Sequence, residues 1–292
     1  MRIEDAKFEI VNKKSGKRLP RDYHCSCSFC KGGYSGMLIR SDGSKYSRRV
    51  RSYYYDEGER VHPAKTPLHL ARYCVQTYTE SGDWVFDPTI GAGTTAVEAL
   101  NFDRNVVGIE LCYYDNVLLN IRKNCRDGKR YKIFHGDAID CGKFLKKAGR
   151  KFRLIINNPP YSADTIVQWG FTGSGKEVRY ETGESGNLAF KRENDEYYKF
   201  IRDIYQEACK HLLFGGYFVV GVKDMMRQKK PYLLHFYLGK ILEEFLSFKE
   251  MILLPHYPPT LFMNTYRKRY PEVEKIPLYQ TILVFRKEKN SK

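Results

Sequence analysis

The sequence predicts an α/β protein with a doubly wound, mostly parallel sheet of seven strands and helices on both faces. From His62 onward, apolar runs of strand length alternate with segments whose apolar residues recur at helical spacing. A glycine-rich turn follows the first of these strands, between Asp87 and Thr94. This alternation favours a parallel sheet, because two parallel strands need a crossover connection that is usually a helix.

Each element has its own signal in the sequence. The first helix is expected at 66–81, where Leu68, Ala71 and Val75 fall at helical spacing, and the first strand is the run at 83–87. Later strands are expected at residues 105–111, 130–137, 152–158, 217–224, 249–256 and 278–287. The helices between them are expected at residues 93–102, 114–125, 141–149, 195–213 and 231–248. Gly215 and Gly216 are expected to end the helix at 195–213.

Three segments depart from this rhythm. Residues 1–60 contain few apolar runs and are expected to form a basic, cysteine-containing N-terminal segment, separate from a main domain at 61–292. Residues 162–193 contain five glycines and little periodicity, so we expect a long mobile loop with a functional role. Residues 257–277, rich in Pro, Tyr and Arg, form an insertion before the last strand.

The charge balance is strongly basic. Lysine and arginine number 50 against 34 aspartates and glutamates, a formal net charge of +16 at pH 7. This surplus favours a polyanionic partner, most simply nucleic acid, although a basic protein without such a partner has the same composition. No apolar run approaches the ~18 residues of a membrane span, and residues 1–10 lack the apolar core of a signal peptide. We therefore expect no membrane contact and a cytoplasmic location.

Acidic residues follow three successive strands: Asp87, Glu110 and Asp137. The carboxyl ends of parallel strands meet at one crevice, so we expect these carboxylates to face one pocket beside the glycine turn. The turn has neither the G-K-[ST] of a phosphate loop nor the spacing G-x-G-x-x-G. A cofactor with a cationic centre, an amino group and no phosphate fits such a pocket, and S-adenosylmethionine is such a molecule. The alternative is a structural turn with acids that cap helices.

The tetrad Asn158-Pro159-Pro160-Tyr161 follows the fourth strand at the same edge of the sheet. Its two prolines end the strand and make a rigid corner. The side-chain oxygen of Asn158 and the carbonyl of Pro159 can therefore accept both N–H groups of a planar exocyclic amine and localise its lone pair for attack on a methyl sulfonium. Tyr161 would stack on a base that has left its duplex. The alternative is a structural turn with a packed tyrosine.

Together these motifs resemble the S-adenosylmethionine-dependent DNA amino-methyltransferases, the family that methylates adenine N6 or cytosine N4. DPTIGAGTT at 87–95 is similar to the DPFxGxGTT motif of that family, NPPY at 158–161 to its catalytic [DNS]PP[YFW], and ILVFRK at 282–287 to its last strand. The resemblance covers residues 61–287. It implies a Rossmann-like class I methyltransferase fold, with the catalytic domain at 61–292.

The resemblance also assigns roles to the matching residues. Cofactor binding is implied for Lys65, Thr66, Pro67, Asp87, Pro88, Thr89, Gly91, Gly93, Thr94, Thr95, Glu110 and Asp137. Among these, Glu110 holds the ribose hydroxyls and Asp137 the adenine amine. The implied catalytic residues are Asn158, Pro159, Pro160 and Tyr161. Two departures leave the subgroup open. Thr89 replaces the aromatic residue that usually follows Asp-Pro. The cofactor motifs resemble those of the beta group, in which the tetrad usually precedes them, but here the tetrad follows them, as in the gamma group.

The implied activity is site-specific DNA methylation on a flipped base, as in restriction-modification systems, and NPPY favours adenine N6. Three alternatives are a cytosine-N4 DNA methyltransferase, an RNA guanine-N2 methyltransferase, and a non-catalytic nucleic-acid-binding subunit that keeps the fold. Double-stranded DNA is the expected partner ahead of RNA, which implies association with the nucleoid. A cognate restriction endonuclease is a further partner that the resemblance implies.

Two features of the chain remain. Cys25, Cys27 and Cys30 include a Cys-x-x-Cys pair that suits half of a zinc site, with free thiols or a redox-sensitive loop as the alternative. SRRVRSYYY (47–55) and TYRKRYP (265–271) combine basic residues with tyrosines, and both are candidates for DNA contact. The N-terminal segment is the first choice for target recognition, and the loop at 162–193 could close over a flipped base.

Overall fold

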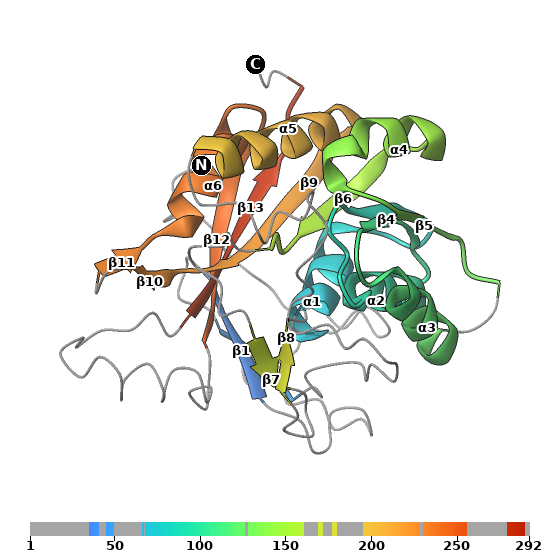
Figure 1. The fold of residues 1–292 in the computed structure, drawn as a ribbon, viewed down its shortest axis with the longest axis horizontal. Helices are drawn as coiled ribbons and strands as arrows, with labels where there is room; N and C mark the ends of the chain where they lie inside the picture. The colour runs from blue at the N-terminus through green and yellow to red at the C-terminus, as the bar shows by residue number, and fades with distance from the viewer. Residues whose placement is uncertain are drawn as a thin grey trace.

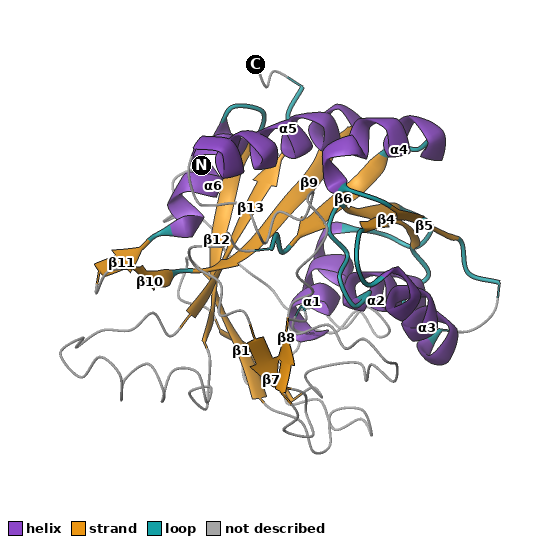
Figure 2. Ribbon diagram, in the orientation of Figure 1, coloured by secondary structure: helices purple, strands orange, loops and turns teal. Residues whose placement is uncertain are grey.

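The computed structural model describes residues 35–40, 45–49, 66, 68–125, 128–160, 169–171, 177–179, 195–227, 230–255 and 279–289. Within these residues one nine-stranded sheet has the strand order β2-β1-β12-β13-β9-β6-β3-β4-β5. Helices lie on both of its faces (Figures 1 and 2). The predicted fold class is therefore confirmed.

Seven of the nine strands form the predicted sheet. In spatial order they are β12 (Ser247–Pro255), β13 (Tyr279–Arg286), β9 (Leu212–Lys223), β6 (Phe152–Asn157), β3 (Trp84–Asp87), β4 (Asn105–Glu110) and β5 (Tyr131–His135). The last five of these run parallel to one another, whereas β13 is antiparallel to both β9 and β12. The carboxyl ends of β3, β4, β5, β6 and β9 therefore lie along one edge, where the site is expected.

Two helical layers cover the sheet. One face is covered by α1 (Leu68–Tyr78), α2 (Thr94–Asn101) and α3 (Tyr114–Asn124), and the other by α4 (Cys141–Ala148), α5 (Asp195–His211) and α6 (Leu234–Glu243) (Figure 1). Successive strand residues alternate between the two cores: Val85 packs with the first group of helices and Phe86 with the second. Burial on both faces explains why β3, β4 and β6 are largely apolar.

The N-terminal segment adds two strands that the sequence did not predict. β1 (Ser35–Arg40) and β2 (Lys45–Arg49) pair with each other, and β1 also pairs with β12, with Ile39 opposite Leu253. β2 has the sequence KYSRR, which lacks the alternation of apolar and polar residues that marks a half-buried strand. The proposed boundary at residue 60 stays a prediction.

The segment expected to be a loop contains a hairpin, because β7 (Trp169–Phe171) pairs antiparallel with β8 (Glu177–Arg179). A second hairpin, β10 (Met225–Arg227) with β11 (Lys230–Tyr232), precedes α6. The helix predicted from residue 231 therefore begins only at Leu234. The carboxylate of Asp224 accepts a hydrogen bond from the backbone N–H of His235 (3.2 Å), which satisfies a donor in the first turn of α6.

The prediction that Gly215 and Gly216 end a helix was wrong. α5 already ends at His211, and β9 begins at the next residue. The pairing of β9 with β6 shifts register between Leu212 and Tyr217. Gly215 lies in this bulge with φ 74, a conformation that favours glycine, so the pair bends a strand instead.

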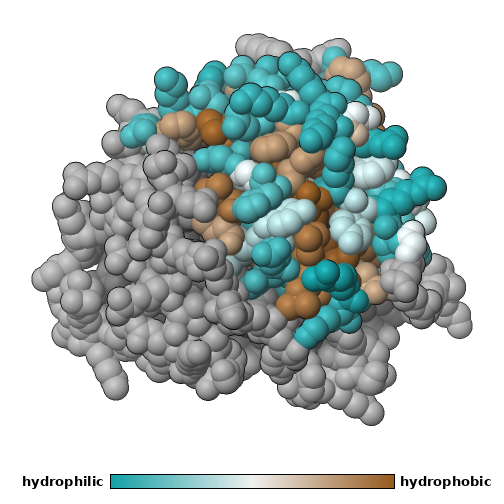
Figure 3. All heavy atoms as spheres, turned by 45° about the vertical axis from the view of Figure 1, so that its right-hand side comes forward, coloured by the Kyte–Doolittle hydropathy of each residue, from teal (hydrophilic) through white to brown (hydrophobic). Residues whose placement is uncertain are grey.

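The structure also describes much of the molecular surface. On the face in Figure 3, the coloured residues are mainly hydrophilic, with apolar side chains visible between the polar ones. No helix among the described residues is long and apolar enough to cross a membrane.

Candidate active site

The glycine turn connects β3 to α2 at the carboxyl edge of the sheet. Gly93 has φ 85 and precedes Thr94, the first residue of α2. A Cβ at Gly93 would lie 3.0 Å from Cγ1 of Val117, so α3 packs directly against this backbone. The side chain of Asn120 donates a hydrogen bond to the carbonyl of Ala92 (2.7 Å) and fixes the turn from the same helix. Thr94 and Thr95 are buried at the start of α2.

Glu110, at the end of β4, is bound to the turn. Its Oε2 accepts a hydrogen bond from the backbone N–H of Gly91 (2.8 Å), while Oε1 accepts from the N–H groups of Cys112 and Tyr113, each at 3.0 Å. Burial raises the pKa of this carboxyl, and the three backbone donors oppose that shift. Glu110 therefore orders the turn, and its buried carboxylate fits a partner with hydroxyl or cationic donors.

Asp87, at the end of β3, is also buried, with 3% of its surface exposed. Burial raises its pKa to about 7, and the nearby charge of Glu110 adds to the shift. The backbone N–H of Thr89 donates to its Oδ1 (3.2 Å), which favours the ionised form. A cation beside Asp87 would favour that form further. Two buried carboxylates beside a tight glycine turn thus fit a cationic cofactor.

Asp137 follows β5 in the position expected from the sequence. Its Oδ1 accepts a hydrogen bond from the backbone N–H of Ile139 (3.0 Å), so it caps the short helix at Ala138–Asp140. The preceding residue, Gly136, donates its N–H to the backbone carbonyl of Glu110 (3.0 Å) and holds the two strand ends together. Asp137 thus has a capping role here, and its contact with a cofactor adenine stays a prediction.

Asn158 lies just beyond β6, with its side chain held on both sides. Its Nδ2 donates to Oγ1 of Thr66 (2.8 Å), and its Oδ1 accepts from Nε2 of Gln280 on β13 (3.2 Å). Pro159 is buried, and the carbonyl of Pro160 accepts a hydrogen bond from the hydroxyl of Tyr197 on α5 (3.0 Å). The first three tetrad residues are thus fixed at the carboxyl edge.

Some predicted site residues lie outside the described residues. These are Lys65, Pro67, Tyr161 and the three cysteines Cys25, Cys27 and Cys30. The structure does place Thr66, and it shows that residue in contact with Asn158 of the tetrad. Among the described residues, no group of three or more His, Cys, Asp or Glu side chains could hold a metal ion. Zinc binding has no support within that part of the chain.

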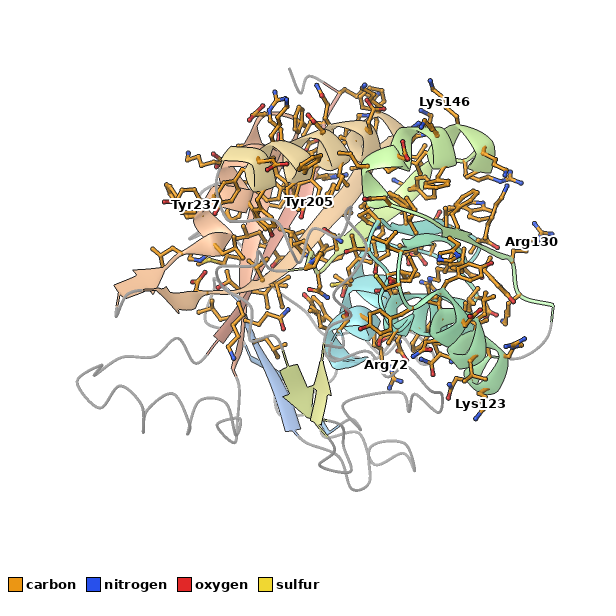
Figure 4. All side chains as sticks on the ribbon, viewed as in Figure 1. Arg72, Lys123, Arg130, Lys146, Tyr205 and Tyr237 are labelled. Carbon is orange, nitrogen blue, oxygen red and sulfur yellow. The ribbon has the colours of Figure 1, made fainter. Side chains whose placement is uncertain are left out.

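A polar bridge that the sequence did not reveal joins the cofactor turn to the last residue of β6, directly before the tetrad, and to α5. Nδ2 of Asn157 donates to Oγ1 of Thr89 (2.7 Å), and Oδ1 of Asn157 accepts from the hydroxyl of Tyr205 (3.0 Å). Tyr205 belongs to α5 and is fully buried; Figure 4 labels it. The threonine that replaces the family's usual aromatic residue thus supplies the hydroxyl of this bridge.

Gln280 and Gly221 were also missed. Gln280 is a polar residue in the apolar run LYQTILVFRK, and it is 7% exposed, so its presence in a buried strand was the available signal. Gly221 lies in β9, between β6 and β13, and its lack of a side chain gives no local signal of a role.

The fold and the site define a class. A parallel sheet with an added antiparallel strand, acids at the ends of β3 and β4, and an Asn-Pro-Pro corner after β6 have the arrangement of the Rossmann-like class I methyltransferase fold. Residues 11–113 match the family model of the N6/N4 methyltransferases, described as DNA methylase. The resemblance to S-adenosylmethionine-dependent DNA amino-methyltransferases is thus confirmed.

Individual relatives point the same way. The chain is 37% identical over 135 residues to the type II methyltransferase M2.DpnII of Streptococcus pneumoniae, covering 38% of this chain and 49% of that protein. It is 49% identical over 49 residues to the type II methyltransferase M.BglI of Bacillus subtilis, covering 17% of this chain and 14% of that protein. The chain thus spans half or less of the length of these relatives. Its fold is similar to that of TrmN from Thermus thermophilus, with a TM-score of 0.50, 15% identity, and coverage of 84% of this chain and 55% of that one.

Proposed function

We propose that this protein transfers a methyl group from S-adenosylmethionine to the exocyclic amine of a base in DNA, and that the base is adenine. One observation supports this most directly: the amide of Asn158 and the buried acid Asp87 lie at the carboxyl ends of two neighbouring parallel strands, β6 and β3. Asn158, which can accept a hydrogen bond from an amine, and Asp87, which favours a cation, therefore lie at the ends of neighbouring strands.

Asp87, Glu110 and the turn between them are the residues that hold the cofactor. When bound, this cofactor supplies a methyl group on a positively charged sulfur. Asp87 becomes ionised beside that positive charge, because an opposite charge stabilises the carboxylate against the cost of burial. Gly93 keeps the turn close to α3, because a side chain at this position would meet Val117.

Asn158 acts on the target amine. Its Oδ1 accepts one N–H of the amine, and the carbonyl of Pro159 accepts the other. Holding both N–H groups concentrates the nitrogen lone pair on the side facing the methyl donor. The nitrogen is a weak nucleophile while its lone pair is delocalised into the ring, so this alignment lowers the barrier by orienting the reactants. No covalent intermediate with the protein is involved.

Adenine is preferred because NPPY resembles the tetrad of the adenine-N6 enzymes more closely than that of the cytosine-N4 enzymes. Access to the tetrad requires the base to leave the duplex. The net charge of +16 supports DNA as the polyanionic partner. Exposed basic side chains also project from the described part of the molecule, including Lys123, Arg130 and Lys146 (Figure 4).

The experiment that tests the proposal identifies the product. The purified full chain is incubated with labelled S-adenosylmethionine and either duplex DNA of mixed sequence or total RNA, and the nucleic acid is digested to nucleosides. Label in N6-methyl-2′-deoxyadenosine from DNA is the expected result. Label in N4-methyl-2′-deoxycytidine would keep the reaction class and change the base. Label in N2-methylguanosine from RNA would contradict DNA as the substrate, and no transfer at all would leave only a binding role.

A further inference from the structure

The amide of Asn158 is held between two residues that lie far from it in the chain. Thr66, 92 residues away, accepts from its Nδ2 at 2.8 Å, and Gln280, 122 residues away, donates to its Oδ1 at 3.2 Å. An asparagine side chain has nearly the same shape after a half-turn that exchanges its oxygen and its nitrogen. Only one of these two orientations presents an acceptor to the N–H group of a target amine.

Gly221 makes the contact between the two amides possible. β9 lies between β6 and β13, so Gln280 must reach Asn158 across this intervening strand. A Cβ at Gly221 would overlap Oδ1 of Asn158 and lie 3.0 Å from Nε2 of Gln280. The absence of a side chain at this one position therefore leaves room for the two amides to meet above the strand.

We propose that Gln280 is a positioning residue for methyl transfer, which fixes the amide of Asn158 with its oxygen available to the target amine. A carbonyl oxygen has two lone pairs, so one can accept from Gln280 while the other accepts from the amine. Thr66 completes the arrangement by accepting from Nδ2. This inference rests on the proposed function, because orientation matters only if Asn158 binds the amine.

Two substitutions at Gln280 separate orientation from packing. Gln280→Met keeps a side chain of similar volume and removes the hydrogen bond, so Asn158 can adopt both orientations. Gln280→Glu keeps the size and reverses the polarity, because an ionised carboxylate only accepts. Lys223 is the cross-strand neighbour of Gln280 and favours that ionised form. The carboxylate then attracts Nδ2 of Asn158 and turns Oδ1 away from Gln280.

The measurement is the single-turnover rate of methyl transfer to DNA, with the affinities for S-adenosylmethionine and for DNA measured separately. We expect the rate to fall about tenfold in Gln280→Met, because one hydrogen bond is lost. We expect it to fall about a hundredfold in Gln280→Glu, because the polarity of that hydrogen bond is reversed. Both affinities are expected to stay at the wild-type level, whereas the melting temperatures fall, because both variants remove a hydrogen bond at a residue that is 7% exposed. Thr66→Val, which removes the acceptor for Nδ2 of Asn158, is expected to lower the rate of methyl transfer.

A rate for Gln280→Glu equal to or above that of Gln280→Met would overturn the proposal. So would losses in both variants that are matched by weaker cofactor binding, because that result indicates a structural role. Asn158→Ala identifies which idea has failed. If that variant is inactive while both Gln280 variants transfer at the wild-type rate, only the positioning role is wrong. If Asn158→Ala itself is fully active, the proposed function of the tetrad is wrong.

Discussion

Replacing Asp87 by asparagine removes a carboxylate that burial keeps close to neutral. In the unfolded chain this group has a pKa near 3.8, whereas in the folded protein burial raises it to about 7. Between these values the folded state holds a proton that the unfolded state has released. The free energy of unfolding therefore decreases as the pH rises from about 4 to about 7.

The size of this effect follows from the two pKa values. A difference of about 3 units at roughly 1.36 kcal/mol per unit gives a cost of about 4 kcal/mol at pH 7, as an upper value for one buried carboxyl. The Asp87→Asn variant lacks this component, because an amide does not ionise in this range. We expect its stability relative to wild type to increase by a few kcal/mol between about pH 4 and about pH 7.

Urea unfolding of both proteins without cofactor, at intervals from about pH 4 to about pH 8, measures this difference. Taking the difference cancels the titration of groups that do not interact with Asp87. Glu110, whose pKa is also raised by burial, interacts with Asp87 and contributes to the difference. Affinity for S-adenosylmethionine gives the opposite trend, because a cation favours ionised Asp87. As the pH rises toward about 7, this affinity should tighten by up to about tenfold per pH unit in the wild type only. A stability difference that is constant with pH would show that burial does not raise the pKa of Asp87.

The site and the charge give three further predictions. Gly221→Ala places a methyl group against Asn158 and Gln280, so methyl transfer should fall steeply while cofactor affinity is retained; an unchanged rate would show that the two amides do not meet above β9. Tyr205→Phe leaves Oδ1 of Asn157 without its buried donor and should lower the free energy of unfolding by about 1–3 kcal/mol, measured with urea; a neutral effect would mean that the hydrogen bond from Tyr205 to Asn157 contributes nothing. Affinity for DNA should fall steeply between low and high salt; binding insensitive to salt would contradict the role assigned to the charge of +16.

The sequence was informative where the fold repeats a local pattern. Asp87 and Glu110 could be placed because each ends an apolar run, and parallel strands bring such ends to one edge. Asn158 could be placed for the same reason, with two prolines that mark the end of its strand. The parallel pairing of β3, β4, β5, β6 and β9 also followed from the alternation of helix and strand.

The sequence was uninformative where a contact depends on strands that are distant in the chain. Gln280 and Gly221 act on Asn158 only because β13 and β9 follow β6 in the spatial order of the sheet, and no local pattern records that adjacency. The hydroxyl of Thr89 could be recognised as a departure from the family motif, but its partner, Asn157, depends on the pairing of β3 with β6. The hairpin before α6 was missed because Pro231 suits both the first turn of a helix and the edge of a ribbon.

The most direct test of the account is the rate of methyl transfer to DNA by Asn158→Ala, measured beside its affinity for S-adenosylmethionine. Asn101→Ala is the matched control, since Asn101 is an exposed asparagine on α2 whose side chain bonds only to the backbone of Asn124 among the hydrogen bonds of the described residues. The account predicts transfer at the background level for Asn158→Ala, with cofactor affinity unchanged, and full activity for the control. Transfer by Asn158→Ala at the wild-type rate would contradict the assignment of the amine to this residue.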